Sequence, residues 1–191
     1  ATPASGFDFG GWGAPCGGVG ACQYAVIEGR TITGTFTPAS SASAAVEGRW
    51  QPPVATPVVA IHMHLLPTGK VLMWGNSGQT RLWDPTNPGG GFVQVTKTYE
   101  IFCSGHTILA DGRLLVAGGV ISGQLGEPRA VIFNPSSGTW GTTSSMAHGR
   151  WYPTVTSLPD GEVLVVAGSD ETGADVTIPE VWNGSQWREL T

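Results

Sequence analysis

Short apolar segments alternate with glycine-containing turns from Val58 onward, and this arrangement occurs three times. Each repeat has an apolar strand, a turn that ends in Gly69, Gly112 or Gly161, and a second apolar strand that ends in glycine. Glycine suits a hairpin turn because it adopts positive φ angles without the steric cost of a Cβ atom. The three segments are HLLPTGKVLMWG (64–75), HTILADGRLLVAGG (106–119) and TSLPDGEVLVVAGS (156–169). Since helical periodicity is not convincing anywhere, the sequence predicts an all-β protein.

The second halves of the repeats also match, because each places an aromatic residue before a turn. These segments are Trp83-Asp84-Pro85, Phe133-Asn134-Pro135 and Trp182-Asn183-Gly184. The turn glycines are 43 and 49 residues apart, which is the length of a four-stranded propeller blade. The pattern resembles the kelch repeat, whose double glycine corresponds to Gly118-Gly119. We therefore predict about three blades of a kelch-type β-propeller over 51–191. A Gly/Ala/Ser-rich segment, 1–50, precedes them, with one expected strand around Thr31–Phe36.

Three blades do not close a ring, because known propellers have roughly four to eight. We expect the ring to be completed by further propeller sequence or by a second protein chain. The combination of two copies of this chain is a less favoured alternative. A half-ring on its own would expose unpaired sheet faces, which promote aggregation.

Composition narrows the class of protein. The chain has 191 residues, among them 29 glycines and 14 prolines, and 40% of its residues are hydrophobic, which argues against disorder. Only 12% are charged, the net charge is −5, and no basic cluster is present, so nucleic acid is not an expected partner. No apolar run approaches the roughly 20 residues that a membrane-spanning helix needs.

Two of the three cysteines lie close together in the sequence. Cys16 and Cys22 flank the glycine-rich segment CGGVGAC, and we interpret them as a local disulfide. A metal pair is the alternative, but no third ligand lies nearby in the sequence. A disulfide indicates an oxidising compartment, so we expect a secreted or otherwise extracytoplasmic protein. The first residues, ATPASG, do not resemble a signal peptide, and this expectation assumes that one has been removed.

The third cysteine falls at a repeated position. Counting nine residues back from the turn glycine gives Cys103 in the second repeat and Tyr152 in the third. Equivalent positions in successive blades are neighbours in space, since each blade repeats the last by a small rotation. The two residues therefore meet near the axial channel. They are either a buried thiol beside a rim tyrosine, as any propeller can have, or a functional pair.

The flanking residues favour a functional pair. EIFCSGHTILADGRLLVAGG (100–119) and MAHGRWYPTVTSLPDGEVLVVAG (146–168) closely resemble segments of the galactose oxidase and glyoxal oxidase family. In that family, the cysteine of a Phe-Cys-x-Gly-His motif forms a thioether with the ring of an Arg-x-Tyr tyrosine. These residues correspond to Cys103 and Tyr152, with Arg150 at the arginine. The resemblance implies that Tyr152 binds copper and that the cross-linked ring forms a stable radical. It also implies oxidation of an alcohol or aldehyde by O2 to give H2O2.

The resemblance also has limits. The family's two histidine ligands and its axial tyrosine come from a later part of the chain, so Tyr152 is the only copper ligand that can be carried over. In galactose oxidase a tryptophan stacks over the cross-link, but the matching position here is Asp170. The shield is then missing or comes from elsewhere.

Other polar residues support more than one role. His62 and His64 lie two apart in an apolar strand and share a face, which suits either a metal pair or, as we favour, a structural role. His106 either orients the site or forms structural hydrogen bonds. Arg150 either pairs with a carboxylate or holds a loop.

The leading hypothesis is the N-terminal part of an extracellular copper radical oxidase whose cofactor is the Cys103–Tyr152 pair. Such a chain is active only when its C-terminal part completes it. The alternative is a non-catalytic kelch propeller fragment that serves as a binding or structural subunit of a larger assembly.

Overall fold

The computed structural model describes residues 7–13, 16–17, 19, 21, 32–38, 48, 50–76 and 79–191. The chain divides into two compact units, residues 1–54 and 55–191, each with its own packing. In the described ranges, no helix is both long and apolar enough to cross a membrane.

The described part of the first unit is a two-stranded antiparallel sheet. Strand β1 (Phe7–Trp12) pairs with β2 (Gly34–Pro38), and a bulge lies between Phe9 and Gly11. Phe9 faces Phe36 across the strands, with ring centroids 5.5 Å apart, and this aromatic pair fixes the register. The expected strand around Thr31–Phe36 is present but begins at Gly34, and β1 was not predicted. Cys22 lies outside the described residues, so the Cys16–Cys22 disulfide stays a prediction.

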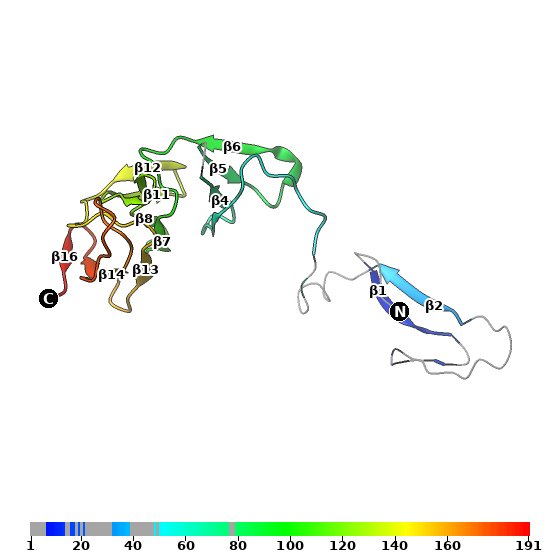
Figure 1. Cartoon of the computed structure of the whole chain (residues 1–191). Helices are drawn as coiled ribbons and strands as arrows, with labels where there is room; N and C mark the ends of the chain where they lie inside the picture. Colours follow the sequence, from blue (N-terminus) through cyan, green and yellow to red (C-terminus); the bar gives the residue numbers. More distant parts are fainter. Residues whose placement is uncertain are drawn as a thin grey trace. The chain divides into compact units, whose positions relative to one another are not determined.

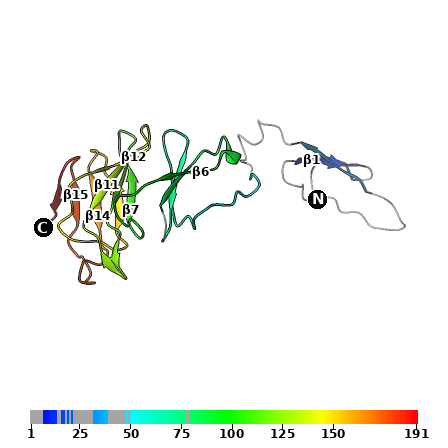
Figure 2. The same cartoon turned by 90° about the horizontal axis from the view of Figure 1, so that it is seen from above.

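The second unit consists of three four-stranded antiparallel sheets, which follow one another along the chain (Figures 1 and 2). The first comprises β3 (His62–Leu65), β4 (Val71–Trp74), β5 (Thr80–Trp83) and β6 (Phe92–Val95), with the 3-10 helix η1 (Pro88–Gly90) before β6. The second comprises β7 (Gly105–Ile108), β8 (Leu114–Ala117), β11 (Ala130–Asn134) and β12 (Thr139–Thr142). The third comprises β13 (Thr154–Ser157), β14 (Val163–Val166), β15 (Glu180–Trp182) and β16 (Trp187–Glu189). A short hairpin, β9 (Val120–Ser122) and β10 (Leu125–Gly126), lies between β8 and β11.

This arrangement confirms the predicted all-β fold with three blades. The turn glycines join the first and second strands of each blade, and their φ angles are positive, as the hairpin pattern requires. The repeated aromatic residues Trp83, Phe133 and Trp182 all lie in third strands.

Strand β8 shows how the blades pack. All four of its residues are fully buried. Leu114 and Val116 point into the core shared with the first blade, where Trp74 is one of their neighbours. Leu115 and Ala117 point the other way, into the core shared with the third blade. A strand that is covered on both faces has no solvent side, which explains why its sequence is apolar throughout.

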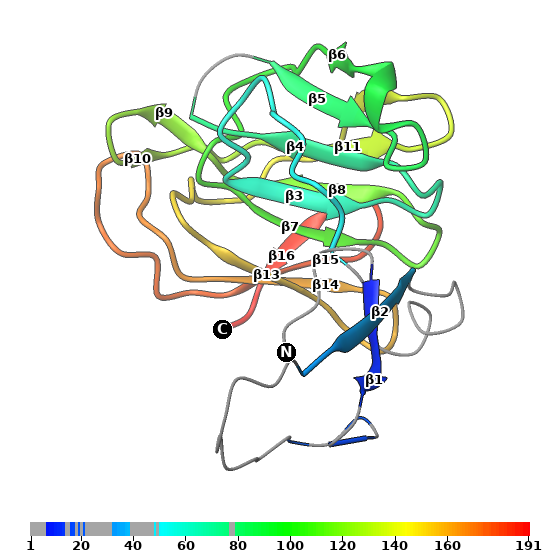
Figure 3. The ribbon, with the colours of Figure 1, turned by 90° about the vertical axis from the view of Figure 1, so that its right-hand side faces the viewer.

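The first strand of the second blade lies next to the first strand of the third blade. Strands β7 and β13 run side by side (Figures 1 and 3), and Thr107 Oγ1 lies 2.9 Å from Ser157 Oγ. Ser157 Oγ also donates to the carbonyl oxygen of Ile108 at 3.0 Å. The segments that lead into β7 and β13 therefore start from neighbouring positions, and these segments carry Cys103 and Tyr152.

Candidate active site around Cys103 and Tyr152

Cys103 and Tyr152 occupy matching positions, each two residues before the innermost strand of its blade. Both have a φ angle of 60°, in the left-handed region, and Ala167 is the only other described non-glycine residue with positive φ. A residue other than glycine pays on the order of 1–3 kcal/mol for such a conformation, so the surrounding structure must enforce it. Backbone strain of this kind concentrates at functional sites.

The two residues contact each other through both backbone and side chain. The Tyr152 N–H donates to the carbonyl oxygen of Cys103 at 2.9 Å. A hydrogen bond with the Cys103 side chain, and the charge of the thiolate when it forms, raise the pKa of the Tyr152 phenol. The thiol residue is 1% exposed whereas Tyr152 is 57% exposed. The sulfur is thus shielded from solvent while the phenol stays accessible.

The two residues before Tyr152 hold it in place, and each is bonded to a different part of the unit. The Arg150 N–H donates to the Glu127 carbonyl at 3.2 Å, and Trp151 exchanges two backbone hydrogen bonds with Ser169, of 2.8 and 3.0 Å. Gly119, from the kelch double glycine, donates its N–H to the carbonyl of Arg150 at 3.0 Å. The neighbouring Gly118 has no room for a side chain, because a Cβ atom would collide with that same carbonyl oxygen.

The buried Arg150 side chain fixes the segment that carries Tyr152. Its guanidinium donates to the carbonyl oxygens of Ala167 and Ile178, at 2.9 and 2.7 Å, and pairs with Glu180 Oε1 at 2.9 Å. Arg150 is 0% and Glu180 1% exposed. The other carboxylate oxygen of Glu180 accepts the Ala147 N–H at 2.7 Å. Arg150 therefore performs both roles that the sequence left open, since it pairs with a carboxylate and holds two loops.

The aromatic neighbour of Tyr152 is Trp151. Their rings meet edge to face, with centroids 4.5 Å apart and planes at 79°. Asp170, at the family's tryptophan position, instead closes a turn, because its carboxylate accepts hydrogen bonds from Thr172 and Ala174. The bond from the Thr172 hydroxyl contributes most to keeping the pKa of Asp170 below its usual value. Sequence reasoning missed Trp151 because adjacent residues of an extended chain point to opposite sides.

Three histidines gather beside Cys103 at the boundary of the first and second blades. His62 Nδ1 lies 3.1 Å from His106 Nε2, and the His64 and His106 ring centroids are 4.6 Å apart. His62 Nε2 accepts the backbone N–H of Cys103 at 3.2 Å. Burial lowers the pKa of all three rings, most for His106, whose pKa falls to about 3. The cluster is therefore neutral at pH 7.

The donor set of the described residues around Tyr152 is incomplete for a metal ion. The Tyr152 phenol is an exposed oxygen donor, but the described residues contain no group of three or more His, Cys, Asp or Glu side chains placed to hold a metal ion.

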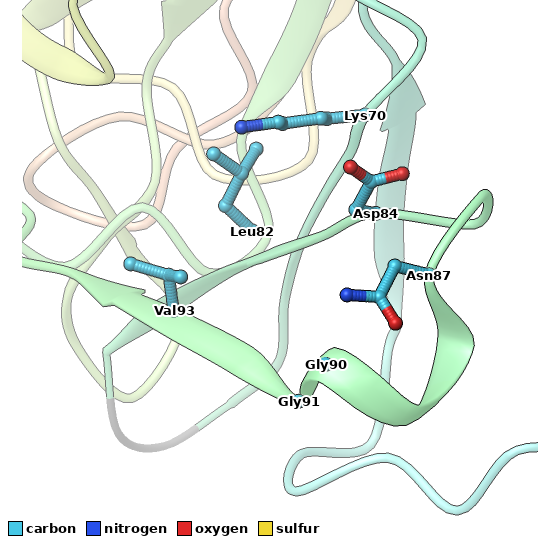
Figure 4. A pocket seen from close by; sticks show the side chains of 7 residues that line it. All are labelled: Lys70, Leu82, Asp84, Asn87, Gly90, Gly91 and Val93. Carbon is cyan, nitrogen blue, oxygen red and sulfur yellow. The ribbon is translucent and has the colours of Figure 1, made fainter.

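A separate hollow lies on the first blade beside η1, and none of its lining residues belongs to the site (Figure 4). Leu82 and Val93 form its apolar side, and Lys70, Asp84 and Asn87 its polar side. Asp84 is already bonded to Thr86, so the hollow presents no free constellation of reactive groups.

Comparison with solved structures identifies the class of fold. The chain matches a fungal alcohol oxidase of the AA5 family, in complex with copper, with a TM-score of 0.60 and 22% sequence identity. The match covers 73% of this chain and 32% of the oxidase. This likeness shows the fold.

Two curated proteins, both galactose oxidases from Gibberella zeae (one from strain PH-1), are 29% identical to this chain over 160 residues. The similarity covers 75% of this chain but 23% of each relative, so the chain spans about a quarter of their length. No family model matches the sequence. The chain is thus distantly similar to galactose oxidase, and its fold is like that of a fungal alcohol oxidase of family AA5.

Proposed function

We propose that this chain forms the first blades of a secreted copper radical oxidase and supplies its Cys103–Tyr152 cofactor. The observation that carries the proposal is the contact of a buried thiol with an exposed phenol, both on left-handed backbone. Both residues hold a strained backbone conformation, and strain of this kind concentrates at functional sites. The similarity to galactose oxidase supports the same assignment.

The cofactor requires one covalent step. A bond forms between Cys103 Sγ and the ring carbon next to the Tyr152 hydroxyl, and the thiol hydrogen and one ring hydrogen are lost. The two electrons and two protons pass to dioxygen, which becomes hydrogen peroxide. The nearness of the Cys103 side chain to the phenol, which raises the pKa of Tyr152, supports this step.

Each residue of the site has a separate role in the proposed chemistry. Tyr152 offers its phenol oxygen to copper, which supplies one-electron redox chemistry when it is bound. Cys103, as a sulfur substituent, donates electron density to the ring and makes the ring easier to oxidise. Arg150 fixes the backbone that carries the ring, and the Trp151 ring packs against the Tyr152 ring edge to face. The substrate is a small alcohol or aldehyde, whose two electrons reduce O2 to H2O2.

The remaining ligands are proposed to come from the blades that complete the ring. The first blade supports this, because one side of β3 faces the second blade while its other side is exposed. His62 and His64 lie on the covered side, and Met63 and Leu65, 51% and 67% exposed, lie on the open side. Exposed apolar side chains on a sheet face favour packing against another sheet. We propose that further propeller sequence or a second chain covers this face.

The test is the mass of the protein, joined to the sequence or chain that completes the propeller, after exposure to copper and oxygen. The thioether removes two hydrogen atoms, and it survives reduction and alkylation. Tryptic mapping should then recover the Cys103 and Tyr152 peptides as one species. The variants Cys103→Ser and Tyr152→Phe, which lack the thiol or the phenol, should keep their full mass. A wild-type protein that retains an alkylatable Cys103 under these conditions would leave the oxidase without its cofactor and favour a binding or structural subunit.

A further inference from the structure

The backbone of Cys103 is held by a residue from the neighbouring blade. Cys103 precedes β7 and takes no part in its ladder, yet its N–H has an acceptor in His62 Nε2, 3.2 Å away. His62 is the first residue of β3 in the first blade. A left-handed residue needs such outside bonds to stay in place. The site proposed above therefore depends on the first blade as well as on the second and third blades, which carry its reactive residues.

The hydrogen bonds fix the tautomer of each ring. Because His62 Nε2 accepts from an amide, it carries no proton, so neutral His62 has its proton on Nδ1. That proton is donated to His106 Nε2 at 3.1 Å. His106 in turn holds its own proton on Nδ1, which is buried and has no hydrogen-bond partner among the described residues. The Nδ1–H form is thus imposed on His62 from both sides of its ring.

Aromatic packing keeps the His62 ring in this orientation. It stacks on Trp74 with centroids 5.0 Å apart and planes at 13°, and it meets the Phe102 ring edge to face with centroids 6.2 Å apart. The Trp74 indole donates to the Ile101 carbonyl at 3.0 Å. The first blade therefore forms hydrogen bonds with Ile101 and with Cys103, the residues on either side of Phe102.

We propose that His62, in the Nδ1–H form that His106 imposes, is the positioning residue that presents Cys103 to Tyr152. This inference rests on the proposed function, because its consequence is the rate at which the thioether forms. His62 touches neither the sulfur nor the phenol oxygen in any described contact; it acts through the Cys103 backbone. Loss of the bond leaves a buried N–H without an acceptor, so cross-linking should slow at least about fivefold.

The experiment compares three variants of the chain. His62→Leu removes the acceptor, and His62→Gln restores one through its amide oxygen. His64→Leu is the matched control, since His64 lies on the same strand and the same face but makes no bond to Cys103. With copper and oxygen, His62→Leu should cross-link at least about fivefold more slowly than wild type, with His62→Gln between them and His64→Leu unchanged. Exchange of the Cys103 amide hydrogen should follow the same order.

A measurement on the wild-type chain keeps the inference testable if a variant fails to fold. Long-range ¹⁵N–¹H correlation spectra of labelled histidine should show the His62 proton on Nδ1. A proton on Nε2, or cross-linking of His62→Leu at the wild-type rate, would overturn the inference. If the wild type forms no thioether at all, the proposed function fails, whereas the tautomer and the amide exchange still decide the role of His62.

Discussion

The buried ion pair beneath Tyr152 gives a prediction with a defined magnitude. The substitution Glu180→Leu leaves the Arg150 charge at 0% exposure with only two carbonyl oxygens as partners. It also removes the acceptor of the Ala147 N–H. Breaking a buried pair from one side costs about 3–5 kcal/mol, because the remaining charge is neither solvated nor neutralised. We expect the free energy of unfolding of the chain to fall by this amount.

Urea unfolding followed by tryptophan fluorescence measures the loss. With a slope of about 1–3 kcal/mol/M, the midpoint should shift by at least about 1 M. The matched control is Glu162→Leu, which makes the same chemical change in the Arg188–Glu162 pair, at 2.8 Å but with side chains 54% and 25% exposed. Exposed pairs contribute about 0–1 kcal/mol. Equal losses in the two variants would show that burial does not set the strength of the Arg150 pair.

The double variant Arg150→Met, Glu180→Leu separates the charge from the packing. It removes both ions and leaves no buried charge, so it should be more stable than Glu180→Leu alone. A double variant as unstable as the single one would indicate that the carbonyl bonds of Arg150, rather than its charge, hold the loops together.

Three further outcomes are expected. The His106 pKa of about 3 lies below the unfolded value of 6.5, so the unfolded state binds more protons below pH 6.5. The free energy of unfolding should therefore fall by about 2 kcal/mol between pH 7 and pH 5. Urea midpoints that coincide at the two pH values would contradict a buried neutral ring. Gly118→Ala should be far less stable by thermal unfolding than Gly69→Ala, because both have positive φ but only Gly118 lies against the Arg150 carbonyl. If the proposed cofactor forms, Trp151→Leu should shorten the lifetime of the tyrosyl radical, followed by its optical absorption, by up to about tenfold, and Trp151→Phe by less; a lifetime equal to that of the wild type in both variants would remove Trp151 from the site.

Repetition in the sequence is what made the fold predictable. The turn glycines and the third-strand aromatics recur at blade length, and the count of nine residues back from Gly112 and Gly161 led to two residues that the structure brings into contact. Because a repeat fixes the same place in every blade, such a count works without any knowledge of side-chain packing. The first unit has no repeat, and there β1 was missed.

Contacts that depend on backbone deviations were not predictable in the same way. The edge-to-face meeting of Trp151 and Tyr152 accompanies a left-handed φ at Tyr152, which no hydrophobic pattern encodes. The bond from Cys103 to His62 joins residues of different blades at non-equivalent repeat positions. Spacing placed His62 and His64 on one face, but it could not show that His106 would meet them from the facing blade.

A covalent link between the sulfur of residue 103 and the ring of residue 152 would also have a mechanical effect on the protein. It would close a loop of about 50 residues that contains all four strands of the second blade, and restricting the unfolded chain in this way contributes on the order of 4 kcal/mol. The second and third blades would then unfold as one cooperative body, while the first blade could still open separately. Formation of the cross-link would therefore stabilise the fold in the same step that completes the cofactor.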